Sequence, residues 1–397
     1  IQKLVDKAVS NGMRGIALTD HGNMFGTKEF YNYCKKVNSK LREEGKPEFK
    51  PIIGCEMYVA RRRKIDKVKD EGDMSGYHLI VLAKNYTGYK NLIKLVSRSW
   101  VDGFYMRPRT DREDLEMYHE GLIVCSACIA GEVPRKILKG DIAGAREAVE
   151  WHRRVFGEDY YLELQRHEVK DPMIHANREV YPLQQRANKV LLELAKEYGI
   201  KVVCTNDAHF VDQENAEAHD HLLCLSTGKD LDDPNRMLYS KQEWFKTREE
   251  MNAVFGDLPE AMQNTIEIFN KVETYSIDHS PIMPFFPIPE DFGTEEEWRK
   301  KFTEQQLYDE FTSDENGENQ LSAEDGAAKI KALGGYEKLY RIKFEADYLA
   351  KLAYDGAKRC YEEPLSDEVV ERINFELHIM KTMGFPGYFL IVQDFIN

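Results

Sequence analysis

The chain has 397 residues, of which 42% are hydrophobic and 31% charged, a balance typical of globular proteins with a substantial core. No run approaches the roughly 18 apolar residues that span a bilayer, and no signal peptide opens the chain, so no membrane association is expected. The net charge of −14 argues against a surface that coats nucleic acid generally, although it allows local basic grooves. The seven cysteines are odd in number and scattered, which favours a reducing cytoplasm over a disulfide framework.

The chain opens on a helical pattern rather than on a strand. Residues 1–12 have the periodicity of an amphipathic helix, with Gly12 near its C-terminal end, and they lead directly into an apolar run at 14–18. A β/α domain normally has a strand before its first helix. We therefore expect the first strand of this domain to be missing from the chain.

Short apolar runs alternate with helical patterns from residue 14 to about residue 210. The predicted strands are Gly15–Leu18, Pro51–Val59, His78–Ala83, Gly121–Val124, Tyr160–Leu164 and Lys201–Cys204. The helical patterns between them include Gly88–Arg98, Ile142–Phe156 and Arg186–Tyr198. This alternation predicts parallel strands joined by crossover helices. The visible strands and one missing strand are enough for a distorted seven-stranded barrel.

The second half of the chain is mainly helical and polar. Residues 211–275 have helical patterns, and a proline-rich run at 280–289 predicts an extended connector. The predicted divisions are a first domain over 1–275, a connector over 276–293 and a second domain over 294–397. Its acidic opening, 294–335, is expected to be an exposed helical excursion with a flexible middle. Helical patterns resume at 335–361 and 367–383, and the aromatic stretch 384–397 is expected to be buried, in a domain cut at its far end.

Two strands end in similar sets of carboxylate and imidazole groups. Asp20 and His21 follow the first predicted strand, and Asp207 and His209 follow the last. The C-terminal ends of parallel strands meet at one edge, so these groups can share a metal site. Imidazole with carboxylate suits zinc, manganese or iron better than calcium. The alternative for Asp207 or its neighbour Asn206 is a helix cap.

Other strands contribute further candidate ligands. Glu56 is a carboxylate inside an apolar strand and needs a partner, either a metal or a basic side chain. His78 can be a metal ligand or a hydrogen-bonded core histidine. It stands at the start of its strand, whereas a metal site at the C-terminal ends of parallel strands would take its ligands from strand ends. Cys128, three residues after Cys125, can complete a mixed site as a thiolate or be a small buried apolar residue.

Two basic stretches interrupt the acidic background, at 61–69 and 98–109. The second mixes arginines with aromatic residues, a combination suited to the backbone and bases of nucleic acid, so Arg107 and Arg109 are candidate contacts. The alternatives are a solvated hairpin and a packed turn. Among the other histidines, His167 can line the site, and His219 is expected at the surface.

Several stretches resemble one family. The chain is similar to the N-terminal region of the bacterial DNA polymerase III alpha subunits at residues 17–26, 50–56, 78–92, 205–210 and 383–392. The resemblance implies a polymerase and histidinol phosphatase (PHP) domain over 1–275, with a distorted (β/α)₇ barrel, and then the mainly helical start of a polymerase palm. It implies a metal cluster whose ligand positions here are His21, Glu56, His78, Cys128, Asp207 and His209, with Asp20 in a supporting role.

The resemblance also sets limits on this chain. The family's remaining ligands, including a His-x-His, lie on the missing first strand, so the cluster is expected to be incomplete. The polymerase aspartates, their magnesium and the nucleotide-binding stretch lie beyond residue 397, so DNA-directed DNA polymerase activity, a nucleotidyl transfer, belongs to the full-length protein. The implied partners are template-primer DNA, a proofreading exonuclease subunit and the sliding clamp.

Three functions follow as hypotheses, and none identifies the catalytic residues. The first is a metal-dependent phosphoesterase that works as a 3′–5′ exonuclease. The second is a structural domain that braces the polymerase and docks the proofreading subunit. The third, less favoured because residues 384–397 match the palm, is a free-standing small-molecule phosphatase.

Overall fold

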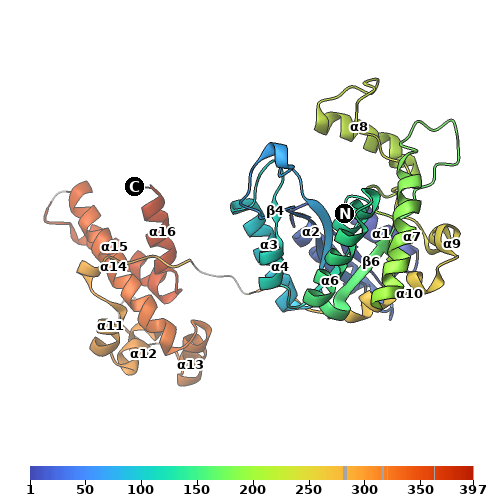
Figure 1. The fold of residues 1–397 in the computed structure, drawn as a ribbon. Helices are drawn as coiled ribbons and strands as arrows, with labels where there is room; N and C mark the ends of the chain where they lie inside the picture. The colour runs from blue at the N-terminus through green and yellow to red at the C-terminus, as the bar shows by residue number, and fades with distance from the viewer. Residues whose placement is uncertain (280–283, 315–316, 320, 362, 397) are drawn as a thin grey trace. The chain divides into compact units, whose positions relative to one another are not determined.

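The computed structural model describes residues 1–279, 284–314, 317–319, 321–361 and 363–396 (Figure 1). The chain forms two compact units, Ile1–Ile277 and Asp278–Asn397, each described here by itself. The boundary falls within the predicted connector 276–293, whose residues 280–283 lie outside the described part of the chain.

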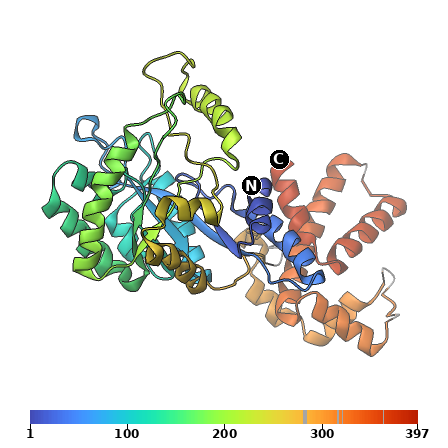
Figure 2. The same ribbon diagram turned by 90° about the vertical axis from the view of Figure 1, so that its right-hand side faces the viewer.

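The N-terminal unit is built on a curled, mixed sheet, seen from two sides in Figures 1 and 2. Its strand order is β1-β2-β3-β5-β6-β7, and the short β4 pairs with β2. The strands are β1 (Gly15–Leu18), β2 (Lys50–Val59), β3 (Tyr77–Ala83), β4 (Arg109–Thr110), β5 (Leu122–Cys125), β6 (Tyr160–Leu164) and β7 (Val202–Cys204). The six predicted strands are therefore present within one or two residues of their expected bounds.

The direction of β3 differs from the expectation of a wholly parallel sheet. β3 runs antiparallel to both β2 and β5, with His78 opposite Tyr58. The segment between β2 and β3 contains only a short 3₁₀ turn, Lys69–Glu71, and a parallel pair would need a longer crossover, usually a helix. As a result, the start of β3 lies at the same edge of the sheet as the end of β2, which removes the positional objection to His78 as a ligand.

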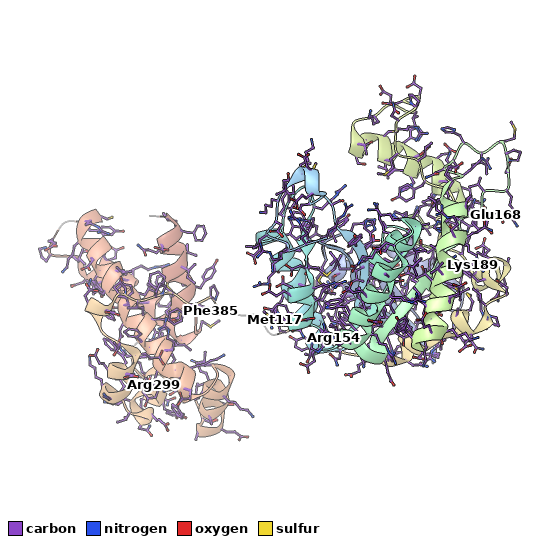
Figure 3. All side chains as sticks on the ribbon, in the orientation of Figure 1. Met117, Arg154, Glu168, Lys189, Arg299 and Phe385 are labelled. Atoms are coloured by element: carbon purple, nitrogen blue, oxygen red, sulfur yellow. The ribbon has the colours of Figure 1, made fainter. Side chains whose placement is uncertain are left out.

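Helices surround this sheet, and their apolar side chains pack with those of the strands to form the core. They are α1 (Gln2–Ser10), α2 (Thr27–Glu43), α3 (Tyr86–Val101), α4 (Arg112–Met117), α5 (Glu132–Leu138), α6 (Ile142–Phe156), α7 (Val180–Tyr198), α8 (Ala216–Thr227), α9 (Arg248–Phe255) and α10 (Pro259–Lys271), with 3₁₀ turns at Gly157–Asp159 and Gln213–Asn215. Ion pairs join their outer surfaces, as between Arg154 of α6 and Glu116 of α4 at 2.7 Å (Figure 3 labels Arg154).

Alternate strand residues face two different cores, as the two-residue period of a strand requires. Val124 and Leu162 belong to the larger core, which α3, α5, α6 and α7 complete, whereas Ile123 and Tyr161 belong to a smaller core that includes Ile268 of α10. Along their strands, Glu56 and Glu163 occupy the same alternate positions as the residues of the smaller core and therefore point to the same face of the sheet. Their carboxylates therefore lie on the concave, inner side of the sheet, where the candidate site is built.

The C-terminal unit is helical in its described residues. Its elements are a 3₁₀ turn at Glu290–Phe292 and the helices α11 (Glu295–Lys301), α12 (Glu304–Thr312), α13 (Ala323–Ala332), α14 (Tyr336–Cys360), α15 (Asp367–Thr382) and α16 (Pro386–Ile396). Within the acidic segment 294–335, helix α12 is packed rather than exposed, because Leu307 and Phe311 are 0% exposed against Leu339 of α14. The predicted flexible middle includes residues 315–316 and 320, which lie outside the described residues. The expected burial of 384–397 holds only in part, because Leu390 of α16 is 0% exposed whereas Phe395 is 88% exposed.

Candidate metal centre

The loop after β1 is held against β2, and this pairing sets His21 beside Glu56. The Asp20 carbonyl accepts the Glu56 N–H at 3.0 Å, and the Gly22 N–H donates to the Glu56 carbonyl at 2.8 Å. Strand-like pairing therefore continues past the end of β1. The His21 ring contacts the Glu56 carboxylate through Nδ1. Glu56 is 4% exposed and His21 is exposed, so the pair reaches from the sheet interior to the surface.

Glu56 is the central anion of the site. Its Oε1 lies 2.8 Å from His78 Nδ1, and its Oε2 contacts His21. Burial disfavours the charged carboxylate, but hydrogen bonds from both histidines outweigh burial and lower its pKa to about 2. The hydrogen bond to Glu56 in turn raises the pKa of His21 against the effect of burial. Glu56 is therefore ionised at neutral pH, as a metal-binding carboxylate must be.

The loop after β5 brings Cys128 to the same place. The His78 N–H donates to the Ala130 carbonyl at 3.1 Å, which ties the start of β3 to this loop. Ala127 has a left-handed backbone with φ of 61°, so the chain turns sharply just before the cysteine. Cys128 Sγ then lies 3.6 Å from His78 Nδ1. Burial, reinforced by Asp207 and Glu56, raises the pKa of this thiol.

Three of these residues fit a metal ion. One ligand atom each from Glu56, His78 and Cys128 can be chosen so that all lie within 4.8 Å of one another. A carboxylate, an imidazole and a sulfur form the mixed donor set found at zinc sites and suited to other transition metals. A bound cation would also favour the thiolate form of Cys128, which burial alone disfavours.

The loop after β7 brings Asp207 and His209 to the side of the His21 ring that faces away from Glu56. Asp207 has φ of 47°, a left-handed conformation that aspartate tolerates better than most residues. His209 Nδ1 lies 2.7 Å from the Asp207 carbonyl and 3.8 Å from Asp207 Oδ1, and its Nε2 lies 3.3 Å from His21 Nε2. Burial raises the pKa of Asp207.

The segment after α8 supports this loop. The His209 N–H donates to the Glu243 carbonyl at 2.8 Å, and Asn206 Nδ2 donates to the carbonyls of Gln242 and Trp244. Contacts thus connect His21, Glu56, His78, Cys128 and His209 in one cluster, with Asp207 beside His209. That each of the six binds a metal stays a prediction.

Asp20 has a separate position from the ligand candidates. Its Oδ2 accepts the Gly26 N–H at 3.1 Å, at the start of α2. The side chain therefore holds the loop that carries His21, and its charge contributes to the raised pKa of His21.

The two arginines proposed for nucleic-acid contact differ sharply in exposure. Arg107 is exposed, and its guanidinium carbon lies 5.8 Å from the centre of the Tyr58 ring. Arg109 is 0% exposed, which differs from the expectation. Its guanidinium donates to the carbonyls of Gly103 and Lys64 at 3.0 and 2.7 Å, so Arg109 holds loops together and does not face a ligand.

Two residues beside the site carried no sequence signal. Tyr239 Oη lies 3.3 Å from His209 Nε2, and the ring of His219 lies 5.5 Å from that of His209 and 5.0 Å from that of Tyr239. His219, expected at the surface, is thus partly buried beside the cluster. Its approach depends on a tertiary contact between α8 and the loop after β7, which no local pattern reports.

Glu163 is a third residue near the site that was not among the predicted ligands. It is 4% exposed on β6 and accepts hydrogen bonds at Oε1 from Thr205 and Gln165, whereas its Oε2 has no partner among the described residues. Burial, reinforced by Asp207 and Glu56, raises its pKa to about 7. Its signal was available, because a glutamate between two leucines of a buried strand needs an explanation, as Glu56 did. His167, expected to line the site, is 3% exposed and bonded to Gln184 and Asn206.

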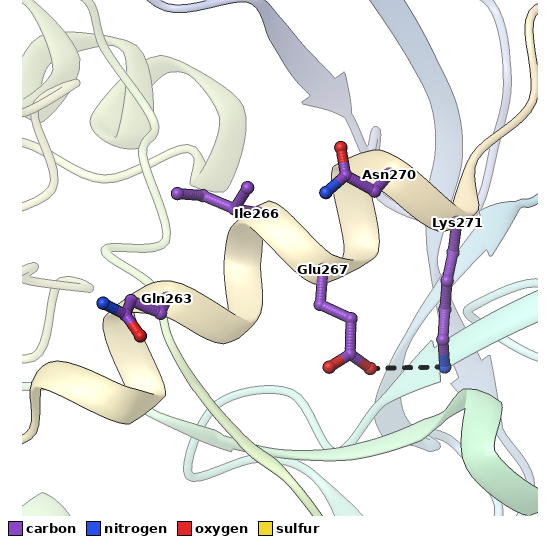
Figure 4. Close-up of a pocket in the computed structure, with 5 residues that line it drawn as sticks. All are labelled: Gln263, Ile266, Glu267, Asn270 and Lys271. Atoms are coloured by element: carbon purple, nitrogen blue, oxygen red, sulfur yellow. Dashed lines mark ion pairs between the residues drawn. The ribbon is translucent and has the colours of Figure 1, made fainter.

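A separate hollow on α10 does not belong to this site. It is lined by Gln263, Ile266, Glu267, Asn270 and Lys271 (Figure 4). Lys271 donates to the Glu158 carbonyl, just before β6 begins, whereas the candidate ligands follow the ends of β1, β5 and β7. The hollow therefore lies at the opposite end of the parallel strands.

Within the described residues, no helix has the length and apolar character needed to cross a membrane.

Comparison with known proteins agrees with this architecture. Residues 1–167 match the family described as the PHP domain, and residues 347–397 match the bacterial DNA polymerase III alpha NTPase domain. The DNA polymerase III alpha subunit of Borreliella burgdorferi is 38% identical over 100% of this chain, and that of Treponema pallidum is 34% identical over 100%. That of Thermus aquaticus is 34% identical over 96% of the chain. The chain spans 28%, 28% and 30% of these relatives.

The fold and the matches together define the class. Within the N-terminal unit, residues 1–167 match the PHP domain, and the predicted fold class of a PHP-type α/β domain followed by a helical region is confirmed. Over its whole length the chain is similar to DNA polymerase III alpha subunits, and its two matched regions are the PHP domain and the DNA polymerase III alpha NTPase domain. A candidate metal-dependent phosphoesterase from Bifidobacterium adolescentis aligns with 52% of this chain and 81% of its own at 15% identity and a TM-score of 0.28.

Proposed function

We propose that the N-terminal unit is a metal-dependent phosphoesterase that acts on the 3′ end of DNA within a replicative polymerase. The observation that carries this proposal is the convergence of Glu56, His78 and Cys128, with ligand atoms within 4.8 Å of one another. The whole-chain similarity to alpha subunits supplies the biological setting. Under this proposal, residues 1–275 are the phosphoesterase domain and 294–397 the beginning of the polymerase palm.

The side chains of the site have distinct tasks in this proposal. A bound zinc, manganese or iron ion would supply Lewis-acid polarisation of the phosphate ester. Glu56 provides permanent negative charge, since its pKa is about 2, and orients His21 and His78 through its two oxygens. The Tyr239 hydroxyl, beside His209, is placed to hydrogen-bond an oxygen of the ester.

The wider assignments belong to the complete protein. We propose that the full-length subunit is a DNA-directed DNA polymerase with magnesium at its polymerase site, acting on template-primer DNA in the cytoplasm. Its expected partners are the sliding clamp and a proofreading exonuclease. For this chain alone, phosphate-ester hydrolysis is the proposed activity.

The test is hydrolysis of a short single-stranded oligonucleotide by the purified chain, and in parallel by the full-length subunit, with manganese or zinc. Asp207→Asn and His209→Ala should each lower the rate at least tenfold. His221→Ala, an exposed histidine on α8, is the matched control and should leave the rate unchanged. Absence of metal binding and of hydrolysis in both proteins would contradict the proposal.

A structural role is the second candidate. It is favoured by the contacts of Glu56 with His21 and His78, which tie the β1 loop, β2 and β3 together without any metal. In this alternative the domain braces the polymerase and docks the proofreading subunit. Asp207→Asn and His209→Ala would then lower the free energy of unfolding while leaving any hydrolysis unchanged.

A further inference from the structure

We propose that Phe25, Trp100 and Phe104 form a stacking platform for the bases of a single-stranded nucleic-acid end, with Arg107 as its phosphate-binding cation. This inference rests on the proposed phosphoesterase function and deepens it, because it names the substrate class and the residues that hold it. We call the three rings the aromatic platform.

The aromatic platform is exposed and continuous. The rings of Phe25 and Trp100 lie 6.4 Å apart, and those of Trp100 and Phe104 are stacked at 5.4 Å with an angle of 18° between their planes. Phe25 is 83% exposed, Trp100 43% and Phe104 44%. Large apolar side chains gathered at a surface mark interaction sites more often than single exposed ones do.

The aromatic platform is tied to the candidate metal centre by hydrogen bonds. Trp100 Nε1 donates to the carbonyl of Gly22 at 2.8 Å, and the Gly22 N–H donates to the carbonyl of Glu56 at 2.8 Å. Gly22 follows His21 directly. A Cβ at Gly22 would lie 2.7 Å from Pro108 Cγ and 3.0 Å from Tyr58 Cε2, so the segment 98–109 packs closely against the loop after β1 that carries His21.

An exposed cation follows Phe104 closely in the chain and lies beside the neighbouring ring of Tyr58. Arg107 is exposed and its guanidinium lies 5.8 Å from the centre of the Tyr58 ring, which in turn meets the His78 ring edge-on at 5.2 Å. The neighbouring Met106 has φ of 62°, and the Tyr105 N–H donates to the Arg107 carbonyl at 3.0 Å, so a tight turn presents this arginine. The guanidinium is thus one side chain away from a candidate ligand.

The chemistry favours a nucleic-acid end over a protein surface. Every base has a flat π-face that stacks on an aromatic ring, and arginine binds the phosphates between bases. The platform combines rings and a cation beside a site for phosphate-ester chemistry. An apolar protein partner would need neither the cation nor the neighbouring site.

The experiment measures binding separately from hydrolysis. A fluorescent six-nucleotide thymidine strand is titrated with the full chain by anisotropy, in low salt with a chelator so that no cleavage occurs. A second strand of equal charge lacks the two bases at its 3′ end. Removing these two bases should weaken binding by the wild-type chain by roughly 5- to 150-fold for each base that stacks, the range of one stacking contact converted to affinity.

Variants then locate the contact. Phe25→Ala and Phe104→Ala should bind the complete strand more weakly and lose most of the preference for it over the abasic strand. Tyr86→Ala is the matched control, because Tyr86 is a 48% exposed aromatic residue at the far end of the same helix α3, roughly 20 Å along its axis from Trp100. It should behave as the wild type does. Circular dichroism confirms that each variant is folded.

The outcomes separate the two proposals. Equal binding of both strands by the wild type, or an unchanged preference in the platform variants, overturns the aromatic platform whether or not hydrolysis is found. Preferential binding that Phe25→Ala and Phe104→Ala remove supports it, even if the proposed hydrolysis fails. If the wild type binds neither strand and is active only on a small phosphate monoester, the aromatic platform is overturned, and of the proposed function only phosphate-ester hydrolysis stands, without its action on DNA.

Discussion

Two glutamates on the inner side of one sheet differ in charge because their neighbours differ. Glu56 is contacted by His21 and His78, and its pKa is lowered to about 2. Glu163 has a hydroxyl and an amide as partners and is buried beside other acids, and its pKa is raised to about 7. Strand position alone predicts burial for both. The partners come from other strands, and only the tertiary structure identifies them.

The raised pKa of Glu163 predicts a pH dependence of stability. The folded chain holds this proton more tightly than the unfolded chain, whose glutamate has a pKa near 4.5. The free energy of unfolding should therefore fall as pH rises from about 4.5 to about 7 and level off above that, by an amount on the order of 3 kcal/mol. Glu163→Gln should flatten this decline in urea unfolding with a chelator present.

The control for this experiment is Glu168→Gln. Glu168 is an exposed glutamate soon after the same strand, and its removal should leave the decline in place. A decline of equal size in Glu163→Gln would show that other groups cause it.

Arg107 and Arg109, at the end of the segment 98–109, allow a matched comparison of the effect of an exposed and a buried arginine on stability. Arg109 is fully buried and donates to the carbonyls of Gly103 and Lys64, so Arg109→Met leaves buried acceptors without donors. The expected loss is about 3 kcal/mol or more of unfolding free energy. Arg107→Met, two residues away and exposed, should change it by no more than about 0.5 kcal/mol. Equal effects in thermal or urea unfolding would refute this distinction.

At the scale of elements, hydrophobic patterns predicted strand positions well and strand directions poorly. β1 and β6 have the bounds expected from their apolar runs. The antiparallel direction of β3 was missed, although the segment before it lacks the pattern of a crossover helix. Attention to that segment would have placed the start of β3, and with it His78, at the site edge. The two-residue β4 is too short to leave a pattern.

The packing of α12 predicts a local effect of mutation. Leu307 is 0% exposed among residues of α12, α13 and α14, so Leu307→Ala should create a cavity and destabilise the C-terminal unit by about 2–5 kcal/mol. Leu321→Ala, at a 39% exposed leucine of the same segment, should cost well under 1 kcal/mol. Hydrogen exchange of α12–α14 measures both. Unchanged protection in Leu307→Ala would mean that this segment is not part of the core.

At the scale of the whole molecule, the chain consists of two units, each of which contains a match to a different family model. The candidate ligands all lie in Ile1–Ile277, and the region matched to the polymerase NTPase domain lies in Asp278–Asn397. Sequence patterns alone located the strand ends that carry the candidate ligands. The choice of ligands depended on resemblance to a family, and the approach of Tyr239 and His219 depended on the fold.

The measurement that tests the metal centre most directly is calorimetric unfolding of the chain with and without zinc, combined with zinc titration. The N-terminal unit should unfold at a higher temperature with zinc, because a ligand that binds only the folded state stabilises it, and the C-terminal unit should be unaffected. Glu56→Gln should abolish both zinc binding and the shift. Zinc binding and a shift of undiminished size in Glu56→Gln would contradict the account.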